Sequence, residues 1–220
     1  MREIRFLWAR CVTRFDPSDR ARMQNIQLAA QKLHGRILLP RAVLSFNAVV
    51  GSRQSPVGGF EAAPVFSDKG RVRALGGGVC QVSSTLYAAV LQTDLQILER
   101  HAHAMPVPYL APGLDATVSN RLDLRIRNPH PFALQIRMEV GDRRLHAEIW
   151  GEKPPSGKVS LALQASRCVR DNVPALQVTV WRTLPDGRRE KLSEDVYYLG
   201  MPLLRDYRSS GRIPMPLRSG

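Results

Sequence analysis

The 220-residue sequence predicts an α+β protein in which a cysteine-bearing helix packs against a mainly antiparallel sheet. Three observations lead to this fold class. Three consecutive glycines, 76–78, precede a stretch whose apolar residues recur at helical spacing. Most later segments alternate apolar and charged residues, which is typical of strands with one face toward solvent. A segment rich in Pro and Gly, 151–157, separates a β-rich extension from the rest.

The N-terminal half is expected to begin with a lead-in, 1–19, in which residues 1–15 form a strand or a short helix of no clear period. A helix should start at 16–19, with Asp16 as its cap and Pro17 at its first position, and should end at 34–35. Short strands and turns are expected over 35–78. They include a strand at 43–46 and a hairpin over 63–75 whose turn is 67–70.

The cysteine helix follows this hairpin directly and is expected to run to about Gln92. An extended segment, 95–103, comes next, and an antiparallel meander is expected over 122–150. Three further strands are expected near 158–168, 175–184 and 191–199, followed by a loosely ordered tail from about residue 205. The predicted units are therefore the lead-in 1–19, an α+β domain 20–151 and the β-rich extension with its tail, 152–220.

The composition indicates a basic globular protein. Lys and Arg number 32 against 19 Asp and Glu, giving a net charge of +13 that is spread along the chain. The charge fits nucleic acid, anionic envelope polymers and acidic lipid, and by itself it does not choose among them. The lack of a Lys/Arg block and of interleaved aromatic residues disfavours nucleic acid as a partner. Three widely spaced cysteines do not predict a disulfide framework.

Neither a membrane span nor a signal peptide can be read from the sequence. No apolar run approaches the roughly 18–20 residues that a spanning helix needs. The first ten residues are interrupted by charges and lack the apolar region of a secretory signal. The sequence by itself thus predicts a cytoplasmic location, and it sets no oligomeric state.

Several segments together resemble the VanW family, which is named for an accessory protein of vancomycin-resistance clusters. The resemblance covers roughly residues 22–151 and is most specific in the run 76–87, GGGVCQVSSTLY. It is also carried by segments 25–30, 46–53, 99–107 and 115–118. The resemblance implies a bacterial protein connected with the cell envelope, where many relatives are anchored and exported. It does not imply a mechanism.

The residues themselves indicate thiol chemistry. Cys80 falls at the start of a helix, where the unpaired N–H groups and the helix dipole lower a thiol's pKa. His101 and His103 lie two residues apart on a predicted strand and so should share a face, and Asp115 begins the next strand. The order Cys, His, acid resembles papain-like and transglutaminase-like enzymes in topology and spacing, which makes a papain- or transglutaminase-like topology a candidate for the domain. His103 is the preferred base over His101, and the amides of Val79 and Cys80 are candidate oxyanion donors.

Other polar residues near these positions are candidates for binding a substrate, each with a structural alternative. Gln81 is either an oxyanion donor or a solvent residue of the first helical turn. Tyr87 either lines the pocket or packs. Arg53 and Arg100 either bind a carboxylate or lie at the surface. The remaining candidates can serve packing, turns or backbone hydrogen bonds: Gly77, Gly78, Ser83, Ser84 and Asn47.

These features favour a thiol-dependent amide hydrolase or acyl transferase that acts on a peptidoglycan-type peptide and needs no cofactor. Two other classes stay open. Cys80, His101, His103 and Asp115 offer thiolate, imidazole and carboxylate ligands that suit zinc. The domain is alternatively a non-catalytic module that binds or organises the cell wall, in which the glycine and serine run serves the fold.

Overall fold

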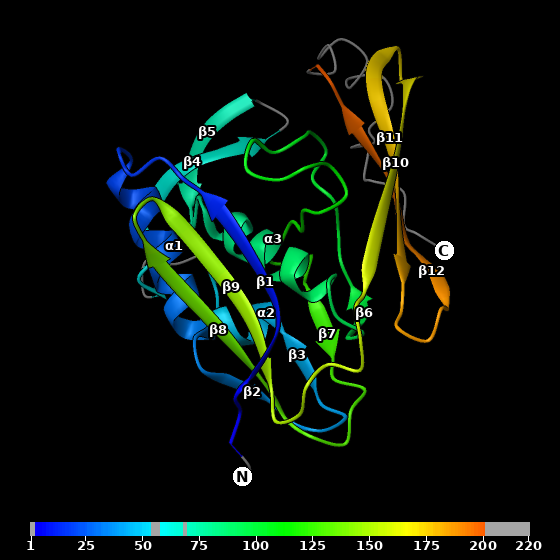
Figure 1. Cartoon of the computed structure of the whole chain (residues 1–220). Helices are drawn as coiled ribbons and strands as arrows, with labels where there is room; N and C mark the ends of the chain where they lie inside the picture. Colours follow the sequence, from blue (N-terminus) through cyan, green and yellow to red (C-terminus); the bar gives the residue numbers. More distant parts are fainter. Residues whose placement is uncertain (1–2, 54–57, 68–69, 201–220) are drawn as a thin grey trace.

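The computed structural model of the chain, shown in Figure 1, describes residues 3–53, 58–67 and 70–200. It has a mixed fold with few helices, and the strand pairings among these residues are antiparallel. The predicted combination of a mainly antiparallel sheet and a cysteine-bearing helix is therefore confirmed at this level. No helix within the described residues combines the length and apolar character that a membrane crossing requires.

The largest sheet has the strand order β1-β9-β8-β2, and helices α1 and α3 pack on it. The four strands are β1 (Phe6–Arg14), β9 (Arg144–Gly151), β8 (Leu134–Gly141) and β2 (Arg36–Leu38). Its two helices are α1 (Arg20–Leu33) and α3 (Val79–Val90). The segment predicted as a lead-in thus contributes β1, which pairs with β9 along its whole length. Figure 1 shows α3 running between this sheet and the C-terminal strands.

The core lies between this sheet and the two helices. Its fully buried members include Ile26 and Leu33 of α1, Leu86 of α3 and Ile149 of β9. Burying one such side chain contributes about 1.5–3 kcal/mol. This packing therefore fixes the position of α3, and with it the position of Cys80.

Helix α1 begins three residues later than predicted, because Asp19 and not Asp16 is its cap. The Asp19 carboxylate accepts a hydrogen bond from the Arg22 N–H at 2.9 Å. Asp16 instead accepts from the Ser18 N–H at 2.9 Å and closes a turn before the helix. Both aspartates can cap an N–H group, and the local sequence alone does not choose between them.

A second difference from prediction lies at residues 43–50. Strand β3 (Val43–Ser45) stops before Phe46, where the short helix α2 (Phe46–Val50) begins. The Ser45 hydroxyl accepts from the Ala48 N–H at 3.0 Å and so caps this helix. The strand predicted through Phe46 is therefore too long by one residue, because the capping bond of Ser45 turns the chain into a helix.

The predicted meander over 122–150 is wrong in its first part. Strand β7 (Arg125–Arg127) does not join β8 but lies between β3 and β6 (Gln96–Glu99) in a separate sheet. Strands β8 and β9 do form the expected hairpin. Alternation of apolar residues indicates a strand, but it does not say which strand is its neighbour.

The hairpin that precedes the cysteine helix is confirmed. Strands β4 (Ala62–Ser67) and β5 (Gly70–Leu75) pair in register, and the two central residues of their predicted turn lie outside the described part. The chain then approaches β4 so closely that a side chain at Gly77 would place its Cβ 2.6 Å from the Ala63 carbonyl oxygen. Gly78 has a φ of +105° and ends this loop as the N-cap of α3.

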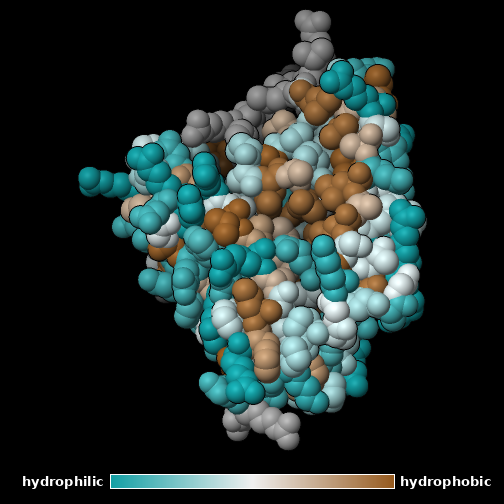
Figure 2. All heavy atoms as spheres, in the orientation of Figure 1, coloured by the Kyte–Doolittle hydropathy of each residue, from teal (hydrophilic) through white to brown (hydrophobic). Residues whose placement is uncertain are grey.

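The C-terminal extension forms a three-stranded sheet, as predicted. Strands β10 (Ser160–Arg170), β11 (Val173–Thr183) and β12 (Arg189–Tyr198) pair in sequence order. The predicted loose tail lies outside the described residues. One face of the sheet packs against the main domain through Val178, Val180 and Tyr197, which surround Ala102. Figure 2 shows apolar side chains gathered in the upper right of the view, where Figure 1 places the connection after β6 and the C-terminal sheet.

Candidate functional site

Cys80 is the only residue of α3 that is not buried. The other eleven residues of this helix are buried between the main sheet and the segment 115–118. The glycine loop places Cys80 in the first turn, next to the N-cap Gly78, as the sequence predicts. Cys80 is a partly exposed residue at the positive end of a helix dipole, where a thiolate is stabilised.

The thiol contacts the segment after Asp115 and the imidazole of His103. Its sulfur lies 3.4 Å from the Val118 carbonyl oxygen and 3.7 Å from the Thr117 hydroxyl. Burial disfavours the thiolate, but the hydrogen bond and positive charge of His103 outweigh that effect and lower the pKa of Cys80 to about 7. The thiolate is therefore more populated at neutral pH than that of an ordinary cysteine.

His103 is held by Asp115 on the side away from the thiol. Its Nδ1 lies 2.7 Å from Asp115 Oδ2, and its backbone N–H donates to the same oxygen at 2.8 Å. With Nδ1 occupied, Nε2 is the ring nitrogen left for Cys80. Burial works against the imidazolium, but hydrogen bonds with Asp115 and Cys80 raise the pKa of His103 to about 9.

Asp115 is fully buried, and its charge is retained by several partners. Tyr197 donates its hydroxyl proton to Oδ1 at 2.6 Å, and Arg100 Nη2 lies 3.4 Å from the same oxygen. Burial favours the neutral acid, yet the hydrogen bond and charge of His103, with smaller effects of Arg100 and Tyr197, lower the pKa of Asp115 to about 2. The site at neutral pH therefore contains a carboxylate, an imidazolium and a partly ionised thiol.

Two buried serines of α3 fix the segment that carries Asp115. Ser83 Oγ donates to the Ala116 carbonyl oxygen at 2.7 Å, and Ser84 Oγ accepts from the Ala116 N–H at 3.0 Å. Both hydroxyls also contact the Cys80 carbonyl oxygen. Ser83 and Ser84 were candidate substrate contacts, but with their side chains fully buried they connect Asp115 to the cysteine helix.

His101 does not share the site with His103. Strand β6 ends at Glu99, so the alternation that would place both histidines on one face stops before them. His101 Nε2 instead lies 3.0 Å from Glu99 Oε1. The segment around Asp115 also lacks strand structure, and its Thr117 N–H donates to the His101 carbonyl oxygen at 2.8 Å. The structure thus brings together Cys80, His103 and Asp115 without the two predicted strands.

The predicted substrate contacts on α3 and after β6 have internal partners instead. Gln81 is buried; its amide donates to Thr13 Oγ1 at 3.0 Å and to the Arg14 carbonyl oxygen at 2.9 Å. It is therefore neither an oxyanion donor nor a solvent residue. Tyr87 packs in the core beneath Arg100, whose guanidinium carbon lies 5.1 Å from the ring centroid. Arg100 is itself buried and paired with Asp115, so it is not at the surface.

The remaining predicted substrate contacts, Arg53, Asn47, Gly77 and Gly78, also have partners inside the protein. Arg53 Nη2 donates to Asn47 Oδ1 at 2.9 Å, and Asn47 Nδ2 donates to the Ser119 and Leu122 carbonyl oxygens. Gly77 and Gly78 are buried against β4 and α1. Burial lowers the pKa of Arg53, while its interaction with Cys80 acts in the opposite direction. Of these residues, Arg53 is thus the one whose charge acts on the thiol.

The four residues of the zinc alternative do not form a ligand group. Among residues 3–53, 58–67 and 70–200, no three His, Cys, Asp or Glu side chains are placed so that they could hold a metal ion. His101 pairs with Glu99, and Asp115 directs its oxygens to His103, Tyr197 and Arg100.

Comparison with known proteins agrees with the resemblance seen in the sequence. The model of the family described as "VanW like protein" matches residues 21–150, which is more than half of the chain. This chain belongs to the VanW family. Cys80, His103 and Asp115 all lie inside the matched region, whereas Tyr197 and Asp195 lie beyond it.

Two curated relatives show how far the VanW likeness extends. The chain is 41% identical over 127 residues to the uncharacterized protein YoaR of Bacillus subtilis (strain 168), covering 57% of this chain and 42% of YoaR. It is 29% identical over 154 residues to the vancomycin B-type resistance protein VanW of Enterococcus faecalis (strain ATCC 700802 / V583), covering 67% of this chain and 56% of that protein. The chain therefore spans about half the length of these relatives. No solved structure matches it.

The sequence did not predict several residues that lie around Cys80, His103 and Asp115 in this VanW-family chain. Tyr109 interacts with Ser84 and Cys80, and burial raises its pKa. Thr117 and Val118 contact the thiol, and their only signal was their place in a family segment. Tyr197 and Asp195 alternate on β12 and so point to one side of it, but nothing in the sequence says that this side meets Asp115.

Proposed function

We propose that this VanW-family chain is a thiol-dependent amide hydrolase or acyl transferase that acts on a peptidoglycan-type peptide. The observation that carries the proposal is the contact of Cys80 with His103 and of His103 Nδ1 with Asp115 Oδ2, at 2.7 Å. Thiol, imidazole and carboxylate in this order supply a nucleophile, a proton carrier and a group that orients the imidazole.

The reaction begins with attack of the Cys80 thiolate on the carbonyl carbon of an amide. As the C–N bond breaks, the His103 imidazolium gives its proton to the departing amine nitrogen, and a thioester forms on Cys80. Neutral His103 then takes a proton from water or from an acceptor amine as that molecule attacks the thioester carbonyl. The C–S bond breaks, Cys80 leaves as the thiolate, and the thiolate–imidazolium pair is restored. Water as the acceptor makes the protein a hydrolase, and an amine makes it a transferase.

The developing oxyanion would be stabilised by the start of α3. The Val79 N–H donates to the Gly76 carbonyl oxygen at 3.0 Å, so it is already engaged. The Cys80 N–H has no backbone acceptor among the described residues and is the amide we assign to the oxyanion. The order Cys, His, acid is also that of papain-like and transglutaminase-like enzymes, although the likeness is one of residue order and chemistry.

The substrate class is supported by charge and by the relatives. A net charge of +13 favours association with anionic polymers of the envelope. One relative is a vancomycin B-type resistance protein. From the positive charge and the printed name of this relative, we propose a wall-type peptide amide as the bond that this site breaks or exchanges.

The test is to incubate the purified chain with soluble peptidoglycan fragments and to follow products and protein mass by mass spectrometry. We expect a released amine and a thioester adduct on the Cys80 peptide. Cys80→Ser should lose the thioester, and His103→Gln should reduce turnover by about a thousandfold. His101→Gln is the matched control and should retain turnover. Turnover that survives Cys80→Ala would refute the proposal.

A non-catalytic wall-binding or scaffolding module is the second candidate. It is supported by the burial of Gly77, Ser83 and Ser84, which is consistent with a glycine and serine run that serves the fold. A pull-down with insoluble peptidoglycan separates the two. Binding that survives Cys80→Ala, with no turnover by the wild type, would establish this second function.

A further inference from the structure

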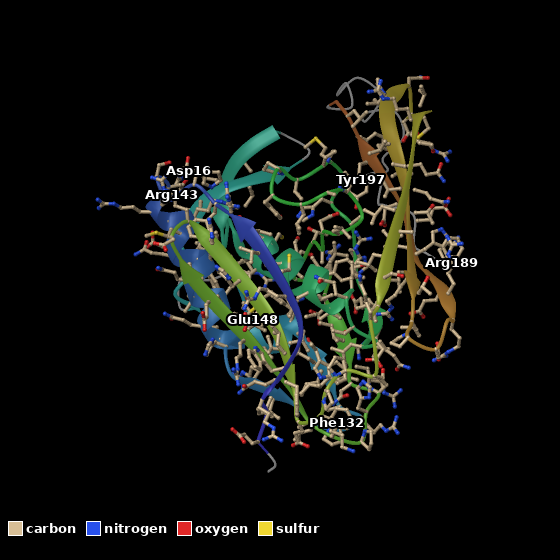
Figure 3. All side chains as sticks on the ribbon, viewed as in Figure 1. Asp16, Phe132, Arg143, Glu148, Arg189 and Tyr197 are labelled. Atoms are coloured by element: carbon tan, nitrogen blue, oxygen red, sulfur yellow. The ribbon has the colours of Figure 1, made fainter. Side chains whose placement is uncertain are left out.

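We propose that the C-terminal sheet completes the thiol site, with Tyr197 of β12 as a positioning residue that acts through Asp115. This inference rests on the proposed thiol function. The family match ends at residue 150, yet Figure 3 shows Tyr197 directed from β12 toward the main domain. The extension thereby brings a side chain to the carboxylate that holds His103.

The hydrogen bonds of Tyr197 fix the direction of its proton. Its oxygen accepts from the Gly113 N–H at 2.7 Å, and Arg100 Nη2 approaches it at 3.2 Å. Both are obligatory donors, so the single phenolic proton is left for Asp115 Oδ1, 2.6 Å away. Because Tyr197 is fully buried, its hydroxyl has no contact with solvent.

The two oxygens of Asp115 consequently have separate tasks. Oδ1 receives Tyr197 and the longer contact from Arg100, whereas Oδ2 receives both the backbone N–H and the Nδ1 of His103. Rotation of the carboxylate would break all of these bonds together. Tyr197 therefore keeps Oδ2 directed at His103, and through His103 it affects the ionisation of Cys80.

Asp195 of the same strand supports this arrangement. The buried guanidinium of Arg100 forms one ion pair with Asp195 and another with Asp115. It also donates through Nε to the Asp115 carbonyl oxygen at 2.7 Å. Without Asp195, Arg100 would have Asp115 as its only carboxylate partner among the described residues and would draw it away from His103. Strand β12 thus supplies both the hydrogen bond and the balancing charge.

The experiment measures the rate of Cys80 alkylation by iodoacetamide as a function of pH in the full chain, with mass spectrometry to distinguish the three cysteines. Tyr197→Phe removes one hydroxyl, and Tyr198→Phe is the matched control. Tyr198 is the next residue on β12, and its hydroxyl donates to Asp171 at the surface. We expect Tyr197→Phe to raise the apparent thiol pKa by about half a unit or more, because His103 stabilises the thiolate less well. Tyr198→Phe should leave it unchanged.

Thermal melting of each variant shows that the profiles come from folded protein. If Tyr197→Phe does not fold, Asp195→Asn replaces it, with the same upward shift expected from the redirected Arg100. A low wild-type thiol pKa that neither folded variant changes would overturn the role of the C-terminal sheet and leave the proposed function standing. A wild-type Cys80 that titrates like an ordinary cysteine would instead overturn the proposed function, and this inference with it.

Discussion

Two histidine–aspartate pairs among the described residues are alike in distance and in the exposure of the imidazole, but they differ in the burial of the carboxylate and in their neighbours. His103 Nδ1 lies 2.7 Å from Asp115, and His130 Nε2 lies 2.9 Å from Asp94. The two imidazoles are similarly shielded, with 20% and 17% of their side chains exposed. The aspartates differ: Asp115 is fully buried, whereas 21% of the Asp94 side chain is exposed.

The surroundings of the two pairs explain the difference. His130 stacks on Phe132 with ring centroids 4.8 Å apart and meets the edge of Trp8, so its ring is part of an aromatic cluster. His103 faces a thiol, and its aspartate is oriented by Arg100 and Tyr197. A short histidine–carboxylate contact is thus not evidence of chemistry. The buried partners of the carboxylate and the group beyond the imidazole are what separate the two pairs.

The largest expected effect is on folding stability, because the two carboxylates differ in burial. Asp115→Asn removes the buried charge that Arg100 and His103 share, and we expect a loss of about 3 kcal/mol in the free energy of unfolding. Asp94→Asn weakens a partly exposed pair and should cost about 1 kcal/mol or less. Urea denaturation measures both. Equal losses would show that the two pairs are equivalent.

The next effect concerns the thiol. In His103→Asn, the hydrogen bond and charge of His103, which lower the Cys80 pKa most, are lost while the burial of the thiol remains, so the pKa should rise to about 9. We therefore expect alkylation of Cys80 at pH 7 to slow by about a hundredfold. His130→Asn should change this rate less than about twofold. The rate of Cys11, whose pKa burial raises to about 11, is the internal reference.

A smaller effect is expected on how folding stability decreases at acidic pH. The pKa of Asp115 is lowered to about 2 in the folded chain, against about 3.9 in an unfolded one. Its contribution, about 3 kcal/mol, is thus complete above about pH 5 and is lost as the pH falls through 2. Melting temperatures between pH 6 and 2 should fall less steeply in Asp115→Asn than in the wild type. Parallel curves would contradict the assigned shift.

The smallest effect is expected at the neighbouring histidine. His101 and His103 are two residues apart, but His101 pairs with Glu99 and does not reach the thiol. His101→Asn should therefore change the pH profile of Cys80 alkylation by less than about 0.2 units. A shift as large as that of His103→Asn would show that both imidazoles act on the thiol.

The sequence was informative wherever the structure depends on local pattern. The glycine run and the apolar period after it placed Cys80 at the start of α3, and alternation located the C-terminal strands to within a few residues. Residue order also suggested that Cys80, His103 and Asp115 belong together. These features follow from the backbone preferences of glycine and from the periods of helices and strands.

The sequence was uninformative wherever a role depends on distant partners. Gln81 and Arg100 look like surface or substrate residues, but the fold buries each against groups brought from other elements. Tyr197 is 82 residues from Asp115 in the chain and joins it only because the C-terminal sheet folds back. The strand rule failed at His101 because β6 ends two residues earlier. Local pattern carries no information about such contacts.

Strand β1 limits how this protein can be divided. It precedes the region that matches the family, yet it pairs with β9, which otherwise has β8 as its single neighbour. A fragment cut at residues 21 and 150 would expose the backbone of β9 as an open edge, which invites aggregation. It would also deprive the Gln81 amide of Thr13 and Arg14 beneath the cysteine helix. The smallest fragment that keeps β9 paired on both sides and the Gln81 amide supported therefore begins before the family boundary, at β1.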